Sequence, residues 1–198
     1  MNEKNVSRCP WLDTSKPDYV DYHDNEWGVP VFDDHKLFEY LTLESAQAGL
    51  SWYTILKRRE GYRAAFSNFD VQKVAAYNQE KIEQLMLNDA IIRNRAKISA
   101  AINNAQRFIE IQNEFGSFSE YMWGFVDHRT LVNDWRQHSD YPATSSISDA
   151  WCKDLKKRGF KFVGSTICYA HMQACGMVND HSHDCYRRKQ IIDQFQQS

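Results

Sequence analysis

The chain has 198 residues, of which 42% are hydrophobic, and a formal net charge of −2 at pH 7. This length suits one or two small domains that fold without disulfide bonds, and it argues against a large multidomain protein. The net charge excludes a global positive field, although a local basic surface would still bind nucleic acid.

Helical periodicity runs through most of the chain and predicts an all-α fold. In chain order, the expected helices lie in residues 33–50, 51–66, 70–77, 78–87, 93–115, 117–126, 146–159 and 164–176. Segments 1–34 and 127–144 hold all four prolines and are expected to be irregular. We also expect the N- and C-terminal segments to meet.

Several helix boundaries carry recognisable capping signals. Asp70 is expected to be an N-cap, with Phe69 and Val74 forming a hydrophobic staple across it. Ser117 and Glu120 have the spacing of a capping box. The long helix is expected to stop before Gly116.

Five cysteines are present, an odd number, in a chain that shows neither a secretory signal sequence nor a run of about 18 apolar residues. We therefore expect a cytoplasmic protein without a membrane span, whose thiols are buried or bind a metal. Three cysteines fall on apolar helical faces and are expected to be buried: Cys152, Cys168 and Cys175.

Residues 155–176, "LKKRGFKFVGSTICYAHMQACG", have the pattern of two helices joined by a tight basic turn. Gly164, followed by Ser165 and Thr166, leaves backbone N–H groups free at a helix N-terminus, where a phosphate would bind. Two interpretations stay open: an αα-turn with a solvated basic face, or a helix–hairpin–helix that grips a nucleic-acid backbone. The basic residues around the turn are Lys156, Lys157, Arg158 and Lys161, with two aromatic residues expected beneath it.

Near the C-terminus, "HSHDC" places His181 and Cys185 four residues apart, a spacing that puts two side chains on one helical face. Cys9 in "RCPW" and His23 in "YHDNEWG" could complete a Cys₂His₂ ligand set. Such a closed site would bind a structural zinc and join the two ends of the chain. The alternative is that these residues serve packing or the surface, because the spacing is not that of a standard zinc finger.

Taken together, these motifs resemble the bacterial 3-methyladenine DNA glycosylase I family. The matching stretches are "RCPW" (8–11), "YHDNEWGVP" (22–30), "LFEYLTLESAQAGLSWYTILKRRE" (37–60), "IIRNRAKI" (91–98), "KKRGFKFVGSTICYAHMQACGMVNDH" (156–181) and Cys185. Ser45 and Ala90 stand where the family usually has Gly, and Ala90 would strain its turn if that position needs a positive φ. The tail after Cys185 matches nothing in the family and is interpreted as a short, basic, partly helical appendage.

The resemblance implies a helix–hairpin–helix DNA glycosylase fold with one structural Zn²⁺ held by Cys9, His23, His181 and Cys185. We divide the chain into a helical glycosylase unit, residues 1–186, and a C-terminal tail, residues 187–198. The implied activity is hydrolysis of the N-glycosidic bond of 3-methyladenine in alkylated double-stranded DNA. The enzyme is expected to be a monomer in the bacterial cytoplasm, at the nucleoid when it acts.

A pocket for a flipped methylated adenine needs aromatic faces and a carboxylate, because N3-methylation gives the base a positive charge. The aromatic candidates are Trp11, Tyr19, Tyr22 and Trp52. Glu44 is the candidate carboxylate, although a solvent-exposed helical residue is the alternative from the residues alone. The resemblance implies that Glu44 accepts hydrogen bonds from the adenine edge, that Tyr22 assists, and that Trp52 stacks.

The short turn "QAGL" provides candidates for filling the gap that a flipped base leaves in the duplex. Gln47, Gly49 and Leu50 are assigned to DNA binding, with Leu50 as an apolar wedge or, alternatively, a core residue. Lys161, Gly164, Ser165 and Thr166 are assigned to the DNA backbone.

N3-alkylation makes adenine a good leaving group, so selective binding and electrostatic help to an oxocarbenium ion can suffice. Whether Glu44 acts as a base, a stabiliser or a reader stays open. No lysine stands out as a Schiff-base nucleophile, so we expect no strand cleavage. Asp180 is expected to support His181 from outside the metal site.

Two rival functions fit parts of the same pattern. A non-enzymatic DNA-binding module would use the hairpin and the metal site without needing Glu44, Tyr22 and Trp52 together. A zinc hydrolase would require an open coordination position on the metal. Release of 3-methyladenine from methylated DNA separates these alternatives from the glycosylase.

Overall fold

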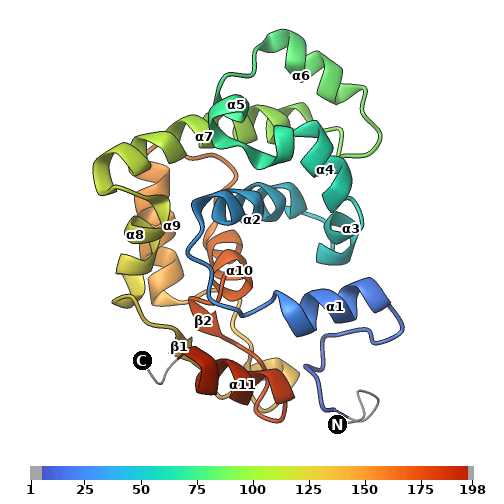
Figure 1. Ribbon diagram of the computed structural model, residues 1–198, viewed down its shortest axis with the longest axis vertical. Coiled ribbons are helices and arrows are strands. Elements are labelled where there is room, and N and C mark those ends of the chain that lie inside the picture. The colour runs from blue at the N-terminus through green and yellow to red at the C-terminus, as the bar shows by residue number, and fades with distance from the viewer. Residues whose placement is uncertain (1–5, 196–198) are drawn as a thin grey trace.

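Helices form almost all of the regular structure in the computed structural model, which describes residues 6–195 (Figure 1). The all-α prediction is therefore confirmed. The helices are α1 (Pro17–Asn25), α2 (Asp34–Gln47), α3 (Trp52–Leu56), α4 (Arg59–Ala65), α5 (Val71–Ala75), α6 (Gln79–Met86), α7 (Arg95–Phe115), α8 (Phe118–Trp123), α9 (Ser146–Lys157), α10 (Ser165–Ala174) and α11 (Tyr186–Phe195). Three-residue 3₁₀ helices lie at Ser67–Phe69, Gly124–Val126 and His138–Asp140.

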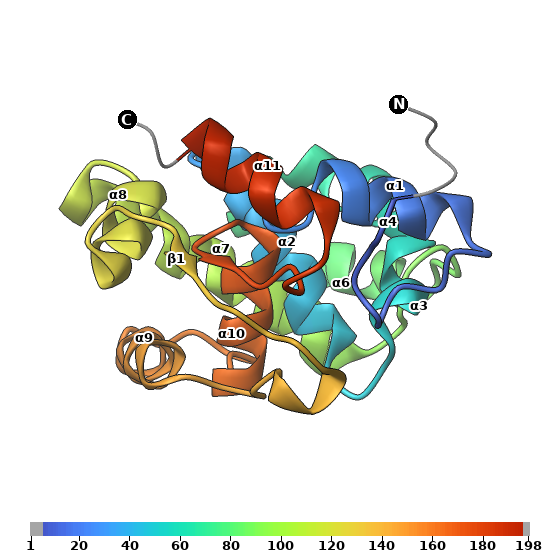
Figure 2. The ribbon, with the colours of Figure 1, turned by 90° about the horizontal axis from the view of Figure 1, so that it is seen from below.

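Helix α2 lies at the centre of the fold, and helices α3, α7, α8 and α10 pack against it (Figure 2). Every residue from Leu37 to Ala46 is buried, polar side chains included. A helix that is buried on all sides leaves its polar side chains away from water, so each needs a partner or a ligand. This explains how a glutamate on α2 comes to lie in the interior.

The predicted capping signals can be compared with the backbone directly. Asp70 caps α5 by accepting from the N–H of Lys73, and Phe69 and Val74 are fully buried beside it. The side chain of Ser117 accepts from the N–H of Glu120, so one of the two bonds of the expected capping box is formed. The long helix ends at Phe115 and is followed by Gly116, which has φ of +88°.

Two local predictions were wrong. Segment 1–34 contains α1, which begins at Pro17; proline at the first helical position has a preset φ, and Asp18 in the first turn favours the helix N-terminus. The single helix expected at 51–66 is divided into α3 and α4 at Arg58, whose φ of −101° and ψ of 1° are not helical.

The N-terminal segment contacts the segment around Tyr186, although residues 6 and 195 lie on opposite sides of the molecule (Figure 2). Strands β1 (Leu131–Val132) and β2 (Val178–Asn179) form a short parallel pair that draws segment 127–144 against the C-terminal region. Helix α11 then returns to the N-terminal segment, where the N–H of Tyr186 donates to the carbonyl of Ser7. Ile191 of α11 is buried, and the segment after Cys185 is helical as far as Phe195; residues 196–198 of the assigned tail lie outside the described residues.

Candidate active site and metal centre

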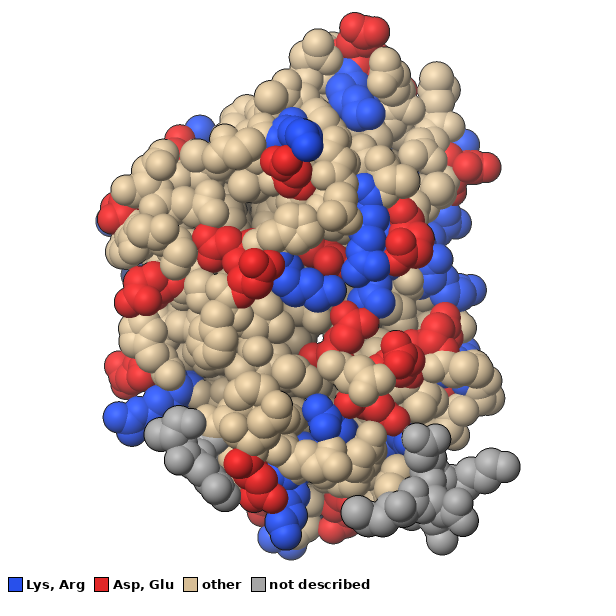
Figure 3. All heavy atoms as spheres, viewed as in Figure 1, with Lys and Arg blue, Asp and Glu red and all other residues tan. Residues whose placement is uncertain are grey.

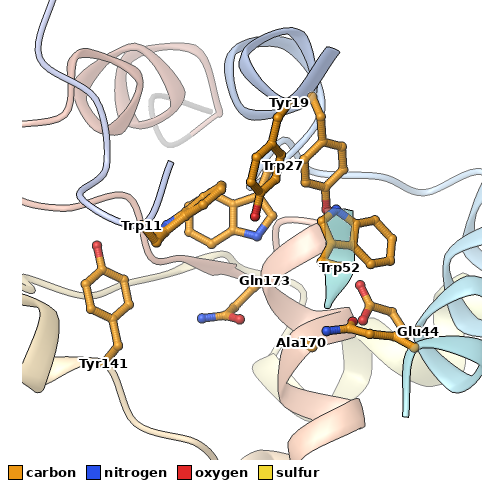
Figure 4. Close-up of a pocket in the computed structure, with 10 residues that line it drawn as sticks. Trp11, Tyr19, Trp27, Glu44, Trp52, Tyr141, Ala170 and Gln173 are labelled. Carbon is orange, nitrogen blue, oxygen red and sulfur yellow. The ribbon is translucent and has the colours of Figure 1, made fainter. Parts of the chain in front are cut away.

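A cavity opens between α1, α2, α3 and α10, beside the loop that precedes α9 (Figure 4). The five residues expected to bind the base all line it: Trp11, Tyr19, Tyr22, Glu44 and Trp52. Gln47 from the DNA-binding set lines it as well. Sequence reasoning missed four further lining residues: Trp27, Tyr141, Ala170 and Gln173.

Glu44 is the carboxyl group of this cavity. Its residue is 3% exposed, so the alternative of a solvent-exposed helical residue is excluded. Its Oε2 has no hydrogen-bond partner within residues 6–195. Burial raises the pKa of Glu44 to about 8, which keeps most of the carboxyl group protonated at neutral pH. A buried carboxyl group with an unmatched oxygen is costly in a native protein and marks a site prepared for a ligand.

Aromatic rings form the walls of the cavity. The rings of Tyr22 and Trp52 lie 5.3 Å apart between centroids, and those of Trp11 and Trp27 lie 4.8 Å apart. Tyr19 and Tyr22 come from one face of α1, three residues apart, which brings both rings to the same side. The Nε1 of Trp52 also has no partner in the described part of the chain. The cavity is thus suited to a flat ligand.

Four predicted metal ligands meet beside this cavity. The ligand atoms of Cys9, His23, His181 and Cys185 all lie within 4.8 Å of one another, and all four residues are buried. His181 Nδ1 is 3.4 Å from each of the two Sγ atoms. In a tetrahedral zinc site, nitrogen and sulfur ligands lie about 3.6 Å apart, so this Cys/His cluster has suitable spacing for a metal ion.

Each histidine of the Cys/His cluster is oriented from outside. Nδ1 of His23 contacts Asp24 at 2.7 Å, and Asp24 in turn pairs with Arg8. Nε2 of His181 contacts the carbonyl of Trp27 at 2.9 Å. One ring nitrogen of each histidine therefore faces the cluster and the other faces an acceptor, the arrangement typical of metal-binding histidines.

The expected role of Asp180 was wrong, because its carboxylate does not contact the ring of His181. It accepts hydrogen bonds from Tyr169, Gln173 and Asn133 instead. His183, the other histidine of "HSHDC", contacts Asp134 and lies outside the cluster.

Two tryptophans separate the Cys/His cluster from the cavity. The ring of Trp11 lies 5.3 Å from that of His23, and the ring of Trp27 lies 4.7 Å from that of His181. Both tryptophans also line the cavity. The cluster therefore helps to set the position of one cavity wall.

The basic hairpin, residues 158–164 between α9 and α10, is held in place by a side chain of α7. The side chain of Asn104 on α7 accepts from the N–H of Lys161 and donates to its carbonyl, both at 2.8 Å. Gly159 has φ of +90°, and Gly164 precedes α10 without a side-chain cap. Of the two aromatic residues expected beneath the turn, Phe160 is buried, but Phe162 is 40% exposed.

The side chains of the hairpin differ in their availability. Arg158 is paired with Asp154 and Glu114, and the hydroxyl of Ser165 bonds to Asp149 and Ser148. Lys161 is exposed and makes no ion pair with any described residue. On the face shown in Figure 3, acidic and basic side chains are interspersed, in keeping with the net charge.

The turn at residues 47–50 projects beside the cavity. Leu50 is 39% exposed, so the alternative of a core residue is excluded, and Gly49 has φ of +79°. The ammonium of Lys97 donates to the carbonyls of Ala46 and Ala48 at 2.8 and 2.6 Å, closing the C-terminus of α2.

The two departures from the family pattern cause no backbone strain in the fold. Ala90 is absent from the residues with positive φ, so the strain considered for this turn does not arise. Instead, the close contact of this turn requires glycine at position 61, because a Cβ at Gly61 would lie 2.5 Å from the carbonyl oxygen of Ala90. Ser45 is buried on α2, and its hydroxyl has no partner among the described residues.

An all-helical chain with an aromatic, carboxyl-bearing cavity next to a turn and a basic hairpin has the features of a base-binding DNA repair protein. The family model described as methyladenine glycosylase matches residues 11–188. The chain belongs to this family, and it is therefore an enzyme that hydrolyses N-glycosyl bonds.

Individual relatives agree with this assignment. The chain is 51% identical over 180 residues to DNA-3-methyladenine glycosylase 1 of Escherichia coli K12, covering 91% of this chain and 96% of that protein. A crystal structure of 3-methyladenine DNA glycosylase I matches with a TM-score of 0.88 and 49% identity, covering 91% of this chain and 98% of that one. A variant of 3-methyladenine DNA glycosylase I in complex with 3-methyladenine matches with a TM-score of 0.86 and 37% identity, over 88% and 94% of the two chains. No helix within residues 6–195 is both long and apolar enough to cross a membrane.

Proposed function

We propose that this enzyme hydrolyses the N-glycosidic bond of 3-methyladenine in alkylated double-stranded DNA, without cleaving the strand. The observation that carries the proposal is the buried carboxyl group of Glu44 inside an aromatic cavity, with its Oε2 lacking a hydrogen-bond partner among the described residues. A flat base with a positive charge supplies what that carboxyl group lacks, and the relative solved with 3-methyladenine is consistent with this choice.

Charge complementarity is the basis of base recognition in this proposal. In the empty cavity the pKa of Glu44 is about 8, and a cationic base favours the carboxylate form, so binding drives loss of the proton. Trp52 and Tyr22 stack on the base, while Trp11 and Tyr19 complete the aromatic surround with cation–π attraction. An uncharged adenine gains neither the attraction to the Glu44 carboxylate nor the cation–π attraction, so the cavity discriminates against normal DNA.

Hydrolysis then needs little further assistance. The alkylated base leaves readily, and the Glu44 carboxylate stabilises positive charge as it develops on the sugar. The ten described residues that line the cavity include no lysine, which favours hydrolysis without a covalent Schiff-base intermediate.

Base flipping uses two further elements. The exposed Leu50, carried by the turn at Gly49, enters the stack as the wedge, and Gln47 lies between this turn and the cavity. The hairpin binds the DNA backbone as a helix–hairpin–helix through Lys161 and the N-terminus of α10, comprising Gly164, Ser165 and Thr166.

We further propose that the Cys/His cluster binds one structural Zn²⁺. Two thiolates and two imidazoles form a closed tetrahedral set, which leaves no position for a reacting water and disfavours the zinc hydrolase alternative. The metal joins the N-terminal and C-terminal segments of a glycosylase unit, which acts as a monomer in the cytoplasm.

The deciding experiment is base release from DNA treated with a methylating agent, with products identified by chromatography. We expect free 3-methyladenine and an intact sugar–phosphate strand. Binding to DNA without release of any base would support the non-enzymatic module instead, and strand breaks formed together with base release would contradict the monofunctional assignment.

A further inference from the structure

Gln173 is a polar side chain of the cavity to which the proposed chemistry assigns no role. It extends from the last turn of α10 into the space between Tyr141 and Glu44 (Figure 4). Its backbone is held as well, because its carbonyl accepts from the N–H of Gly28 at 3.0 Å. The amide group is therefore presented to the cavity from a fixed point.

A buried carboxylate sets the orientation of this amide group. Nε2 of Gln173 donates to Oδ2 of Asp180 at 2.8 Å, and Asp180 is 0% exposed. The same carboxylate accepts from Tyr169 at 2.7 Å and from Asn133 at 2.6 Å. A carboxylate can only accept, so the nitrogen of the Gln173 amide must face Asp180. Oε1 is consequently turned away from Asp180.

We propose that Gln173, oriented by Asp180, selects adenine over guanine among the N3-methylated bases that enter the cavity. The inference rests on the proposed function, since it concerns the base bound there. Adenine carries an exocyclic amine, a donor, at the position where guanine carries the acceptor O6. Oε1 of Gln173 can accept from that amine but would oppose O6 directly, and a buried acceptor left facing an acceptor is strongly disfavoured. Gln173 contacts the base, and Asp180 acts as a positioning residue.

Two variants of the metal-loaded protein test this inference. Asp180→Asn replaces the obligate acceptor with a group that can also donate, so the Gln173 amide can reverse and offer its nitrogen to O6. Gln173→Met keeps the length of the side chain and removes its acceptor. The measurements are binding of free 3-methyladenine and free 3-methylguanine, followed by quenching of tryptophan fluorescence, and release of both bases from methylated DNA.

We expect the preference for 3-methyladenine to fall about tenfold or more in both variants, because one matched or mismatched buried hydrogen bond has an effect of this order. In Asp180→Asn, affinity for 3-methylguanine should also rise in absolute terms. Tyr169→Phe is the matched control: it removes another donor to Asp180 without freeing the amide, and its preference should equal that of the wild type.

The outcomes are distinguishable from failure of the proposed function. A wild-type enzyme that binds and releases neither base would overturn the function itself. A wild type that prefers 3-methyladenine, with variants that lose affinity for both bases in equal proportion, would overturn the selective role and leave only a structural one. Should Asp180→Asn fail to fold, the ratio measured for Gln173→Met decides.

Discussion

The cavity and the Cys/His cluster share Trp11 and Trp27, but they differ in how their polar atoms are matched. In the cavity, Oε2 of Glu44 and Nε1 of Trp52 have no partner within the described residues. In the cluster, every ligand atom faces the others, and the outer nitrogens of His23 and His181 have acceptors. A matched group stabilises the fold, whereas an unmatched one lowers stability and is available for a ligand. Two adjoining regions of one fold thus differ in whether their polar atoms have partners, which is what the proposed supporting role of the cluster and the proposed binding role of the cavity require.

Loss of a cluster ligand should have the largest effect. For Cys185→Ser we expect the free energy of unfolding to fall by about 4 kcal/mol or more, since binding of a structural metal contributes directly to folding. Denaturant unfolding and metal content measured on the same samples check this. His183→Ala is the matched control outside the cluster, and its free energy of unfolding and metal content should equal those of the wild type. A stable Cys185→Ser protein with full metal content would contradict the supporting role of the cluster.

Glu44→Gln should lower activity and leave the folded structure intact, whereas loss of a cluster ligand lowers stability. We expect release of 3-methyladenine to fall about 10²-fold, the effect of removing one preorganised electrostatic group from a reaction centre. Metal content and helicity should not change. Glu39→Gln is the control, because Glu39 is buried on the same helix but pairs with Lys36 and Arg63 outside the cavity. Equal losses of activity in the two variants would show that Glu44 has no special part.

The stability of the wild type should depend on pH through Glu44. Its pKa is about 8 in the folded protein and near 4.5 in the unfolded chain, so the folded state binds the extra proton between these values. The stabilising contribution is complete below pH 4.5, declines as pH rises, and is lost above about pH 8. Relative to that of Glu44→Gln, the free energy of unfolding of the wild type should fall by roughly 3–5 kcal/mol across this range. Urea unfolding of both proteins at pH 5 and pH 8.5 measures the difference, and parallel pH profiles would contradict it.

The smallest effect is expected outside both regions, at the basic hairpin. Lys161→Ala should weaken binding to methylated and unmethylated DNA alike and lower the slope of log affinity against log salt by about 1. Excision at saturating enzyme should stay close to the wild-type rate. A loss confined to methylated DNA would place Lys161 in base recognition and contradict the assignment of that role to the cavity alone.

The parts predicted from the sequence were those with a local pattern. The helical periods, the Asp70 cap and the glycine at 116 depend on neighbours within one or two turns. The four ligands of the Cys/His cluster could be offered as a set from residue type, with packing as the alternative, and the family resemblance favoured the set and supplied the roles around Glu44. Trp27 stands inside the matching stretch "YHDNEWGVP" and could have been included on that ground.

Other features had no local signal. Tyr141 lies in a segment expected to be irregular, and it reaches the cavity because β1 pairs with β2. Asp180 follows β2 and precedes a cluster ligand, so its neighbour in sequence suggested the wrong partner. Its actual partners, Gln173, Tyr169 and Asn133, lie 7, 11 and 47 residues away.

Helix positions, capping residues and the residue types needed for a metal and a cationic base follow from short-range chemistry, which the linear order of residues contains. The unmatched state of Glu44, the direction of the Gln173 amide and the separation of the cluster from the cavity by two tryptophans follow from burial. Burial is decided only when α2 is enclosed by its neighbours and the segment around Cys9 is brought against the segment around Cys185.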